Sequence, residues 1–110
     1  MKAKVEVDAG VCGFHTAVQA ISDDGQFVTF SIQSDCEKIR TVGEKLSEKG
    51  PVDAYGEIGA GDEGVLMQTA HSILKGCCAG CVVPAGIFKG MQVAACVALP
   101  KDIHITMQKE

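Results

Sequence analysis

The segment LKGCCAGCVVPAGIFKG, from Leu74 to Gly90, contains three cysteines within five residues. Cys78 and Cys81 form a C-x-x-C pair, a spacing that lets two sulfurs approach one metal ion, or each other, across a tight turn. The alanine and glycine between them tolerate the backbone angles that such a turn needs. Cys77, directly before the pair, could replace either neighbour as a ligand. The sequence therefore predicts metal binding or thiol chemistry in this segment.

Two further cysteines could complete a metal site with this pair. One C-x-x-C supplies two sulfurs, whereas tetrahedral zinc or a cubane iron–sulfur cluster is held by about four thiolates or near equivalents. The stretches AGVCGF and QSDCEK each contribute one more cysteine. The predicted metal ligands are Cys12, Cys36, Cys78 and Cys81.

The predicted cofactor is an iron–sulfur cluster or zinc, because ligation by sulfur alone suits both. The spacing departs from the ferredoxin run C-x2-C-x2-C-x3-C-P, since only two valines separate Cys81 from Pro84. An electron-transfer ferredoxin is therefore not expected. The apolar Val82 and Val83 favour a shielded cluster. We predict a small cysteine-rich, metal-binding protein.

Two alternatives come from other functional classes. The Cys78–Cys81 pair could serve a thiol redox or persulfide-transfer enzyme, in which one thiolate attacks and the other resolves the intermediate. The chain could also be a partner-binding subunit with no chemistry of its own, and Gly86 and Gly90 could let another helix pack closely, within the chain or across a homo-oligomer. Whether the protein is an enzyme is left open, and nothing in the sequence names a substrate or a protein partner.

The stretch GAGDEG, from Gly59 to Gly64, matches the G-x-G-x-x-G pattern of dinucleotide-binding loops. Asp62 and Glu63 would place carboxylates where a pyrophosphate must lie, and the chain is too short for the usual doubly wound domain. We interpret these glycines as turn and helix-start residues.

The remaining candidates have simpler interpretations. His15 could be a ligand or a proton donor, but its place in a predicted strand favours an exposed face. Cys96 lies among alanines of a predicted helix and is expected to be a buried core thiol.

The pattern of apolar residues predicts the elements that position these cysteines. Apolar and charged residues alternate from Lys2 to Ala9, and a similar alternation runs from Val28 to Gln33, as in half-buried strands. Between them, the Asp24-Gly25 step is typical of a hairpin and favours an antiparallel strand from about Phe14 to Ser22, although this segment also has helical spacing.

Further along the chain, capping signals and breakers mark the other elements. The predicted elements are a helix capped by Ser34 and Glu37 that ends at Gly50-Pro51, a fourth strand in VDAYGEI, a helix from about Glu63 to Lys75 capped by Asp62, a helix from Pro84 to about Ala98, and a closing strand through Ile103, Ile105 and Met107. Together they predict an α+β fold, with a single mostly antiparallel sheet and about three helices packed on one face.

This topology brings two distant cysteines to the same side of the sheet. In a three-strand meander, the first and third strands end at the same edge, and in a strand-helix-strand unit the two parallel strands do so as well. Cys12 follows the first strand and Cys36 follows the third. Both are therefore expected on one side under either arrangement.

Composition limits the classes of function. The 110 residues, 46% of them hydrophobic, are expected to form a single globular domain from 1 to 110. A net charge of −4 argues against binding nucleic acid or an anionic membrane. The N-terminus has no signal-peptide pattern, so we expect a cytoplasmic protein, and six cysteines in that reducing compartment favour metal or thiol chemistry over disulfides.

Three stretches together resemble a known family: DAGVCGF, IQSDCEKI and CVVPAGIFKGMQVAACVALPKDI. The chain is similar, over nearly its whole length, to an uncharacterised family of small cysteine-containing prokaryotic proteins. The resemblance brings no assigned activity and therefore no functional residues. The extra thiol of the Cys77-Cys78 pair departs from that pattern and leaves open which neighbour is the ligand.

Overall fold

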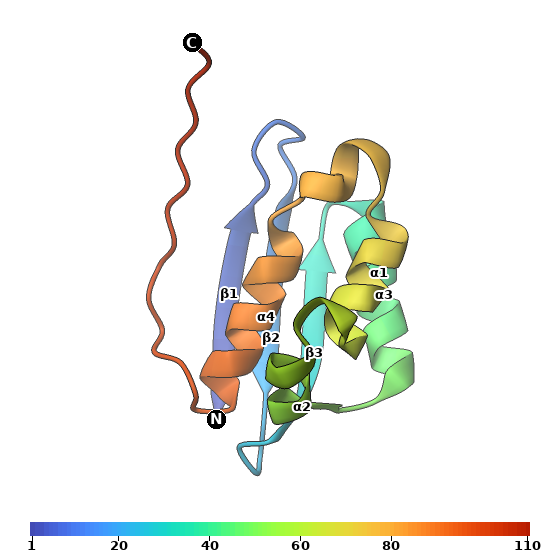
Figure 1. Cartoon of the computed structure of the whole chain (residues 1–110), viewed down its shortest axis with the longest axis vertical. Coiled ribbons are helices and arrows are strands. Elements are labelled where there is room, and N and C mark those ends of the chain that lie inside the picture. Colours follow the sequence, from blue (N-terminus) through green and yellow to red (C-terminus); the bar gives the residue numbers. More distant parts are fainter.

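A computed structural model describes all residues from 1 to 110, and its centre is one antiparallel sheet of four strands in the order β1-β2-β3-β4 (Figure 1). The strands are β1 (Lys2–Asp8), β2 (His15–Ile21), β3 (Phe27–Ser34) and β4 (Val52–Asp53). The predicted meander is confirmed, including the strand between Phe14 and Ser22. At the β2–β3 hairpin, Gly25 has a φ of 76° and the Asp24 carboxylate accepts from the N–H groups of Gln26 and Phe27.

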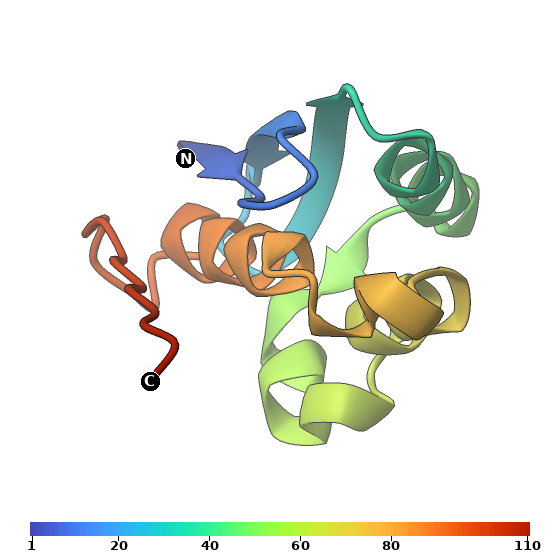
Figure 2. The same ribbon diagram turned by 90° about the horizontal axis from the view of Figure 1, so that it is seen from above.

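The helices cover one face of this sheet (Figure 2). They are α1 (Glu37–Lys49), α2 (Ala54–Ala60), α3 (Val65–Ile73) and α4 (Val83–Ala94), with short 3-10 turns η1 (Gly61–Glu63) and η2 (Gly76–Gly80). The sheet buries alternate residues such as Val18, Ala20 and Val28 toward the helices, while Lys4 and Thr29 point to solvent on the other face. The predicted α+β class is confirmed.

Helix α4 lies unusually close to β1. A Cβ atom added at Gly86 would be 2.9 Å from a methyl carbon of Val7, and one added at Gly90 would be 2.9 Å from a methyl carbon of Val5. The two glycines therefore let a helix approach a strand within the chain, instead of a second helix. Ile87 on the same helix is completely buried in the core.

The stretch Gly76–Ala94 is long and apolar enough, by length and composition alone, to cross a membrane. Core helices meet the same criterion, and the α4 part of this stretch buries Ile87 and Met91 against the rest of the chain. Because 33% of the 18-residue window within this stretch is buried, packing accounts for part of its apolar character.

Two predicted element boundaries are wrong, the start of the first helix and the end of the fourth strand, and in each case a side chain has another partner. Helix α1 has Cys36, not Ser34, as its N-cap residue, because Ser34 stays in β3 and its hydroxyl accepts the Cys36 N–H at 3.1 Å. The fourth strand ends at Asp53, whose carboxylate accepts from the N–H groups of Tyr55 and Gly56 and so starts α2.

The start of α3 also differs from the prediction. Asp62 lies in η1, and the helix begins at Val65 after Gly64, which has no side chain to cap it. The buried carboxylate of Glu57 takes that place by accepting from the N–H groups of Val65 and Leu66 at 3.0 and 2.6 Å.

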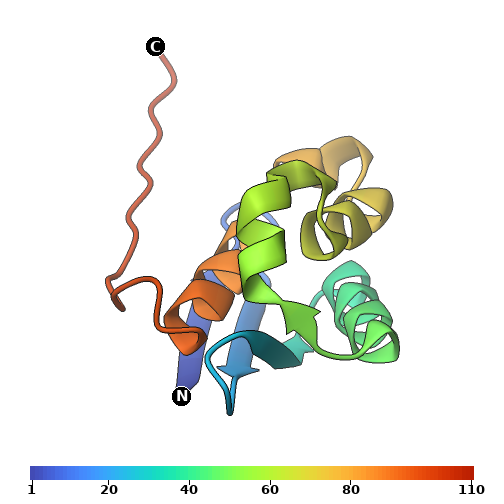
Figure 3. The same cartoon turned by 60° about the horizontal axis from the view of Figure 1, so that its bottom comes forward.

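The predicted closing strand does not form. Residues after Leu99 carry no regular secondary structure, and Ile103, Ile105 and Met107 are exposed by 61%, 63% and 88%. This C-terminal segment leaves the end of α4 and runs in the same direction as β1 without pairing with it (Figures 1 and 3).

Candidate thiol site

Five of the six cysteines belong to segments that meet at one end of the molecule. The β1–β2 loop, the junction between β3 and α1, η2 and the start of α4 all lie at the top of Figure 1. Seen from above in Figure 2, the β1–β2 loop, the beginning of α1 and η2 are arranged around the beginning of α4. Because β1 and β3 run in the same direction on either side of β2, their C-terminal ends reach this side together.

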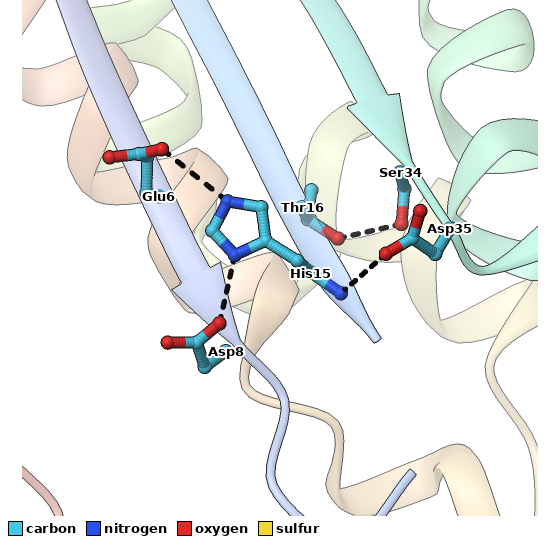
Figure 4. A network of polar contacts seen from close by, with 6 residues as sticks. All are labelled: Glu6, Asp8, His15, Thr16, Ser34 and Asp35. Atoms are coloured by element: carbon cyan, nitrogen blue, oxygen red, sulfur yellow. Dashed lines mark hydrogen bonds and ion pairs between the residues drawn. The ribbon is translucent and has the colours of Figure 1, made fainter. Parts of the chain in front are cut away.

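The Cys36 backbone is held by a polar network at the ends of β2 and β3, of which Figure 4 shows the contact between Thr16 and Ser34. The Thr16 hydroxyl, 1% exposed, lies 2.7 Å from the Ser34 hydroxyl, which in turn accepts the Cys36 N–H. Arg40 donates to the Ser34 carbonyl at 2.9 Å. The Cys36 side chain is half-buried against the core. Its position therefore follows from the sheet.

Cys12 lies in the exposed β1–β2 loop. The loop is closed by two backbone hydrogen bonds, from Ala9 to Phe14 at 3.1 Å and from Gly13 to Gly10 at 2.9 Å. Both glycines have positive φ, 87° and 72°, and space is open around each of them. The loop thus presents Cys12 to solvent, and no other residue packs at its two glycines.

The remaining thiols come from η2 and the residue that follows it. The Cys81 N–H donates to the Cys78 carbonyl at 3.1 Å, so the C-x-x-C pair forms a tight turn. Cys78 and Cys81 are half-buried against the core, whereas Cys77 is exposed. The turn therefore directs two of its three thiols inward.

The pKa of Cys81 is sensitive to its surroundings. Burial raises the pKa of the Cys81 thiol above its ordinary value, and a hydrogen bond with the Val83 backbone partly opposes this. The charges of Cys36, Cys12 and Cys78 raise the pKa further. Cys81 thus lies within range of the charges of the other three predicted ligands.

One cation reaches the site. The Lys38 ammonium donates to the Cys78 sulfur at 3.7 Å. Lys38 was not among the predicted site residues, although its place two residues after Cys36, in the first turn of α1, is a signal that could have pointed to it. Thr16 and Ser34 were missed as well, because their contact joins strands that are separate in sequence.

The four thiols suit a metal by type and number, but they are spaced more widely than a coordination shell. No group of three or more His, Cys, Asp and Glu side chains lies close enough together to hold a metal ion. All six cysteines are free thiols. The donor set is therefore soft and all-sulfur, as zinc and iron–sulfur clusters prefer, and its least restrained member is Cys12 in the open loop.

Two other candidates from the sequence lie outside this cluster. The His15 ring contacts Asp8 at 2.8 Å and Glu6 at 3.4 Å on the exposed face of the sheet, so both its nitrogens have partners (Figure 4). Cys96, expected in the core, is exposed instead. It ends α4 in a left-handed conformation with φ of 63°, and its thiol lies 3.7 Å from the Met1 sulfur.

The chain belongs to a family of unknown function, DUF6951, whose model matches residues 3–107. No curated protein and no solved structure matches the chain. The uncharacterised family expected from the sequence is thus confirmed, and the matched range spans the positions of all four predicted ligands.

Proposed function

We propose that this protein binds a metal through Cys12, Cys36, Cys78 and Cys81, as zinc or as an iron–sulfur cluster. The observation that supports the proposal is that the segments carrying these four cysteines lie at one end of the molecule, where three of the thiols are half-buried and where burial and the charges of the other three raise the pKa of Cys81. Thiols that disfavour one another's ionisation need a cation before all of them can be thiolates. A bound metal supplies that charge and releases the protons.

The surroundings of the thiols support a site that closes on its metal. Cys36, Cys78 and Cys81 are half-buried against the core, but no three of these thiols lie close enough together to hold a metal, so the site would have to contract on binding. Cys12 would have to approach them with the β1–β2 loop, and nothing packs at the two glycines of that loop to oppose this movement. Thr16 and Ser34 hold the Cys36 backbone, and they act as positioning residues for that ligand.

The test is the metal content of protein purified without oxygen. We expect close to one zinc ion per chain and no colour, or iron and acid-labile sulfide with a charge-transfer absorption band. Colourless, metal-free protein that takes up neither zinc nor a reconstituted cluster would overturn the proposal.

Serine variants separate ligands from other cysteines, because serine keeps the shape but is a poor ligand for these metals. Cys12→Ser, Cys36→Ser and Cys81→Ser should each lose most of the metal. Cys96→Ser is the matched control, since Cys96 is exposed at the opposite end of α4 and should leave metal content unchanged. A Cys77→Ser variant that loses metal as fully as Cys81→Ser would assign the ligand role to Cys77.

A thiol enzyme is the second candidate, and the Lys38 contact favours it. An ammonium 3.7 Å from the Cys78 sulfur is a suitable partner for an attacking thiolate. Cys78 would attack a substrate disulfide and release one thiolate. Cys81 would then attack the mixed disulfide at the Cys78 sulfur, release the second thiolate, and leave a Cys78–Cys81 disulfide, so that the protein loses the two electrons that the substrate gains.

Alkylation after equilibration with glutathione buffers tests this candidate. Joint protection of Cys78 and Cys81, with a midpoint that shifts in Lys38→Met but not in the control Lys45→Met, would support it. If both thiols stay free at every glutathione redox potential, the redox role is eliminated. Metal analysis decides the leading proposal independently.

A further inference from the structure

Two segments with the character of strands lack partners in this structure. Strand β1 pairs only with β2, so its outer edge presents a row of free backbone N–H and C=O groups. The segment 98–110 takes part in no backbone hydrogen bond. Proteins usually pair or cover a regular sheet edge, and an apolar extended segment can add to such an edge as a strand.

The C-terminal segment has the composition of a half-buried strand. Apolar Ile103, Ile105 and Met107 alternate with the polar residues between them, and all three are more than half exposed. The family model extends to residue 107, so it includes this whole alternation. The segment is therefore part of the family's common chain, and its apolar side lacks a covering surface.

The end of α4 directs this segment away from its own sheet. The Val97 N–H donates to the Gln92 carbonyl at 2.9 Å, and Cys96 adopts the left-handed conformation, which together form a closed helix-ending turn. Beyond it the chain stands clear of the body in all three views (Figures 1, 2 and 3). It also runs in the same direction as β1, so pairing within one chain would add a parallel strand to an otherwise antiparallel sheet.

Antiparallel pairing of this segment with β1 therefore requires a second copy of the chain. One register places apolar residues of the segment beside apolar residues of β1 and polar residues beside polar ones. When Ile105 lies beside Val7, Met107 lies beside Val5, and these pairs share the face that the helices cover. The same register places His104 beside Asp8 and Gln108 beside Lys4, both on the open face. The His104–Asp8 pair brings opposite charges together when the histidine is protonated.

We propose that residues 103–108 of one copy add as an antiparallel strand to the outer edge of β1 in a second copy, and that reciprocal exchange of these segments forms a dimer. The exchange covers the open edge and the apolar side of the tail in both copies. It does not depend on the thiol site.

The mass of the full-length protein in solution, measured by sedimentation equilibrium over a range of concentrations, tests this inference. We expect a dimer whose dissociation constant rises by more than about tenfold in Ile105→Lys, because the lysine would enter the covered face. Thr106→Lys is the matched control: it adds the same charge on the open face and should leave the dimer intact.

Hydrogen exchange on the same samples identifies the contact. Amides of β1 and of residues 103–108 should be protected in the dimer and should lose protection together on dilution. A protein that is monomeric at every concentration would overturn the proposal. So would a monomer with protected tail amides, which indicates pairing within one chain, or a dimer that Ile105→Lys does not weaken.

Discussion

Glu57 is the side chain whose removal should destabilise the protein most clearly. It comes from α2, it is 6% exposed, and its carboxylate accepts from Val65 at 3.0 Å and Leu66 at 2.6 Å. Since Gly64 cannot cap α3 itself, both N–H groups depend on this carboxylate. A Cβ added at Gly64 would lie 2.7 Å from it, so the close approach also needs the glycine.

The magnitude follows from those two contacts. A hydrogen bond to a charged group contributes about 1.5–3 kcal/mol, and a lost helix cap costs about 1 kcal/mol. The two bonds share one carboxylate, and water can reach the vacated position in part, so the sum is not fully additive. We expect Glu57→Ala to lower the free energy of unfolding by about 3 kcal/mol, and Glu57→Gln, which keeps one acceptor oxygen, by about half of that.

Urea unfolding followed by circular dichroism measures the change. For a slope of about 2 kcal/mol per molar urea, the midpoint should fall by about 1.5 M in Glu57→Ala with the slope unchanged. Glu63→Ala is the control, because Glu63 is exposed in η1 and should change stability by less than about 0.5 kcal/mol. A Glu57→Ala protein as stable as the control would refute the assignment of the cap.

Two further predictions test packing and protonation. Gly90→Ala should lose about 1–2 kcal/mol, because its Cβ would lie 2.9 Å from a methyl carbon of β1 and the gain in helix propensity offsets only part of the overlap. Gly59→Ala, exposed in the last turn of α2 with open space around it, should instead gain up to about 0.5 kcal/mol. Equal effects of the two substitutions in urea unfolding would contradict the close packing. The pKa of His15 is raised, chiefly by its hydrogen bond to Asp8. The stabilisation that the bound proton gives is therefore complete below the ordinary histidine pKa and is lost as pH rises through the folded-state pKa. An NMR titration should show a lower His15 pKa in Asp8→Asn, and an unchanged pKa would refute the pairing.

Local patterns determined much of the secondary structure. The alternation from Lys2 to Asp8 corresponds to β1, and the Asp24-Gly25 step makes the β2–β3 hairpin, since both depend on neighbouring residues in the chain. The expectation that the ends of β1 and β3 share a side also followed from the sequence, because strand direction alone decides it.

Contacts between distant segments decided the rest. The start of α3 depends on a carboxylate eight residues earlier in the chain, and the N-cap position of Cys36 depends on where the Ser34 hydroxyl finds its partner on β2. Cys96 looked like a core residue because its neighbours are apolar, but α4 ends just before it, at Ala94, in a turn that leaves the thiol exposed.

For the candidate site, too, the sequence determined one part and the tertiary structure the other. The sequence by itself determined which residues have the chemistry, because thiols at C-x-x-C spacing need no fold to be recognised. Only the tertiary structure decided that η2 and the start of α4 lie at the same end of the sheet as Cys12 and Cys36, and that Lys38 reaches Cys78. The physical reason is that the position of α4 is set by its glycines against β1, a contact between residues about eighty positions apart, which no local pattern contains.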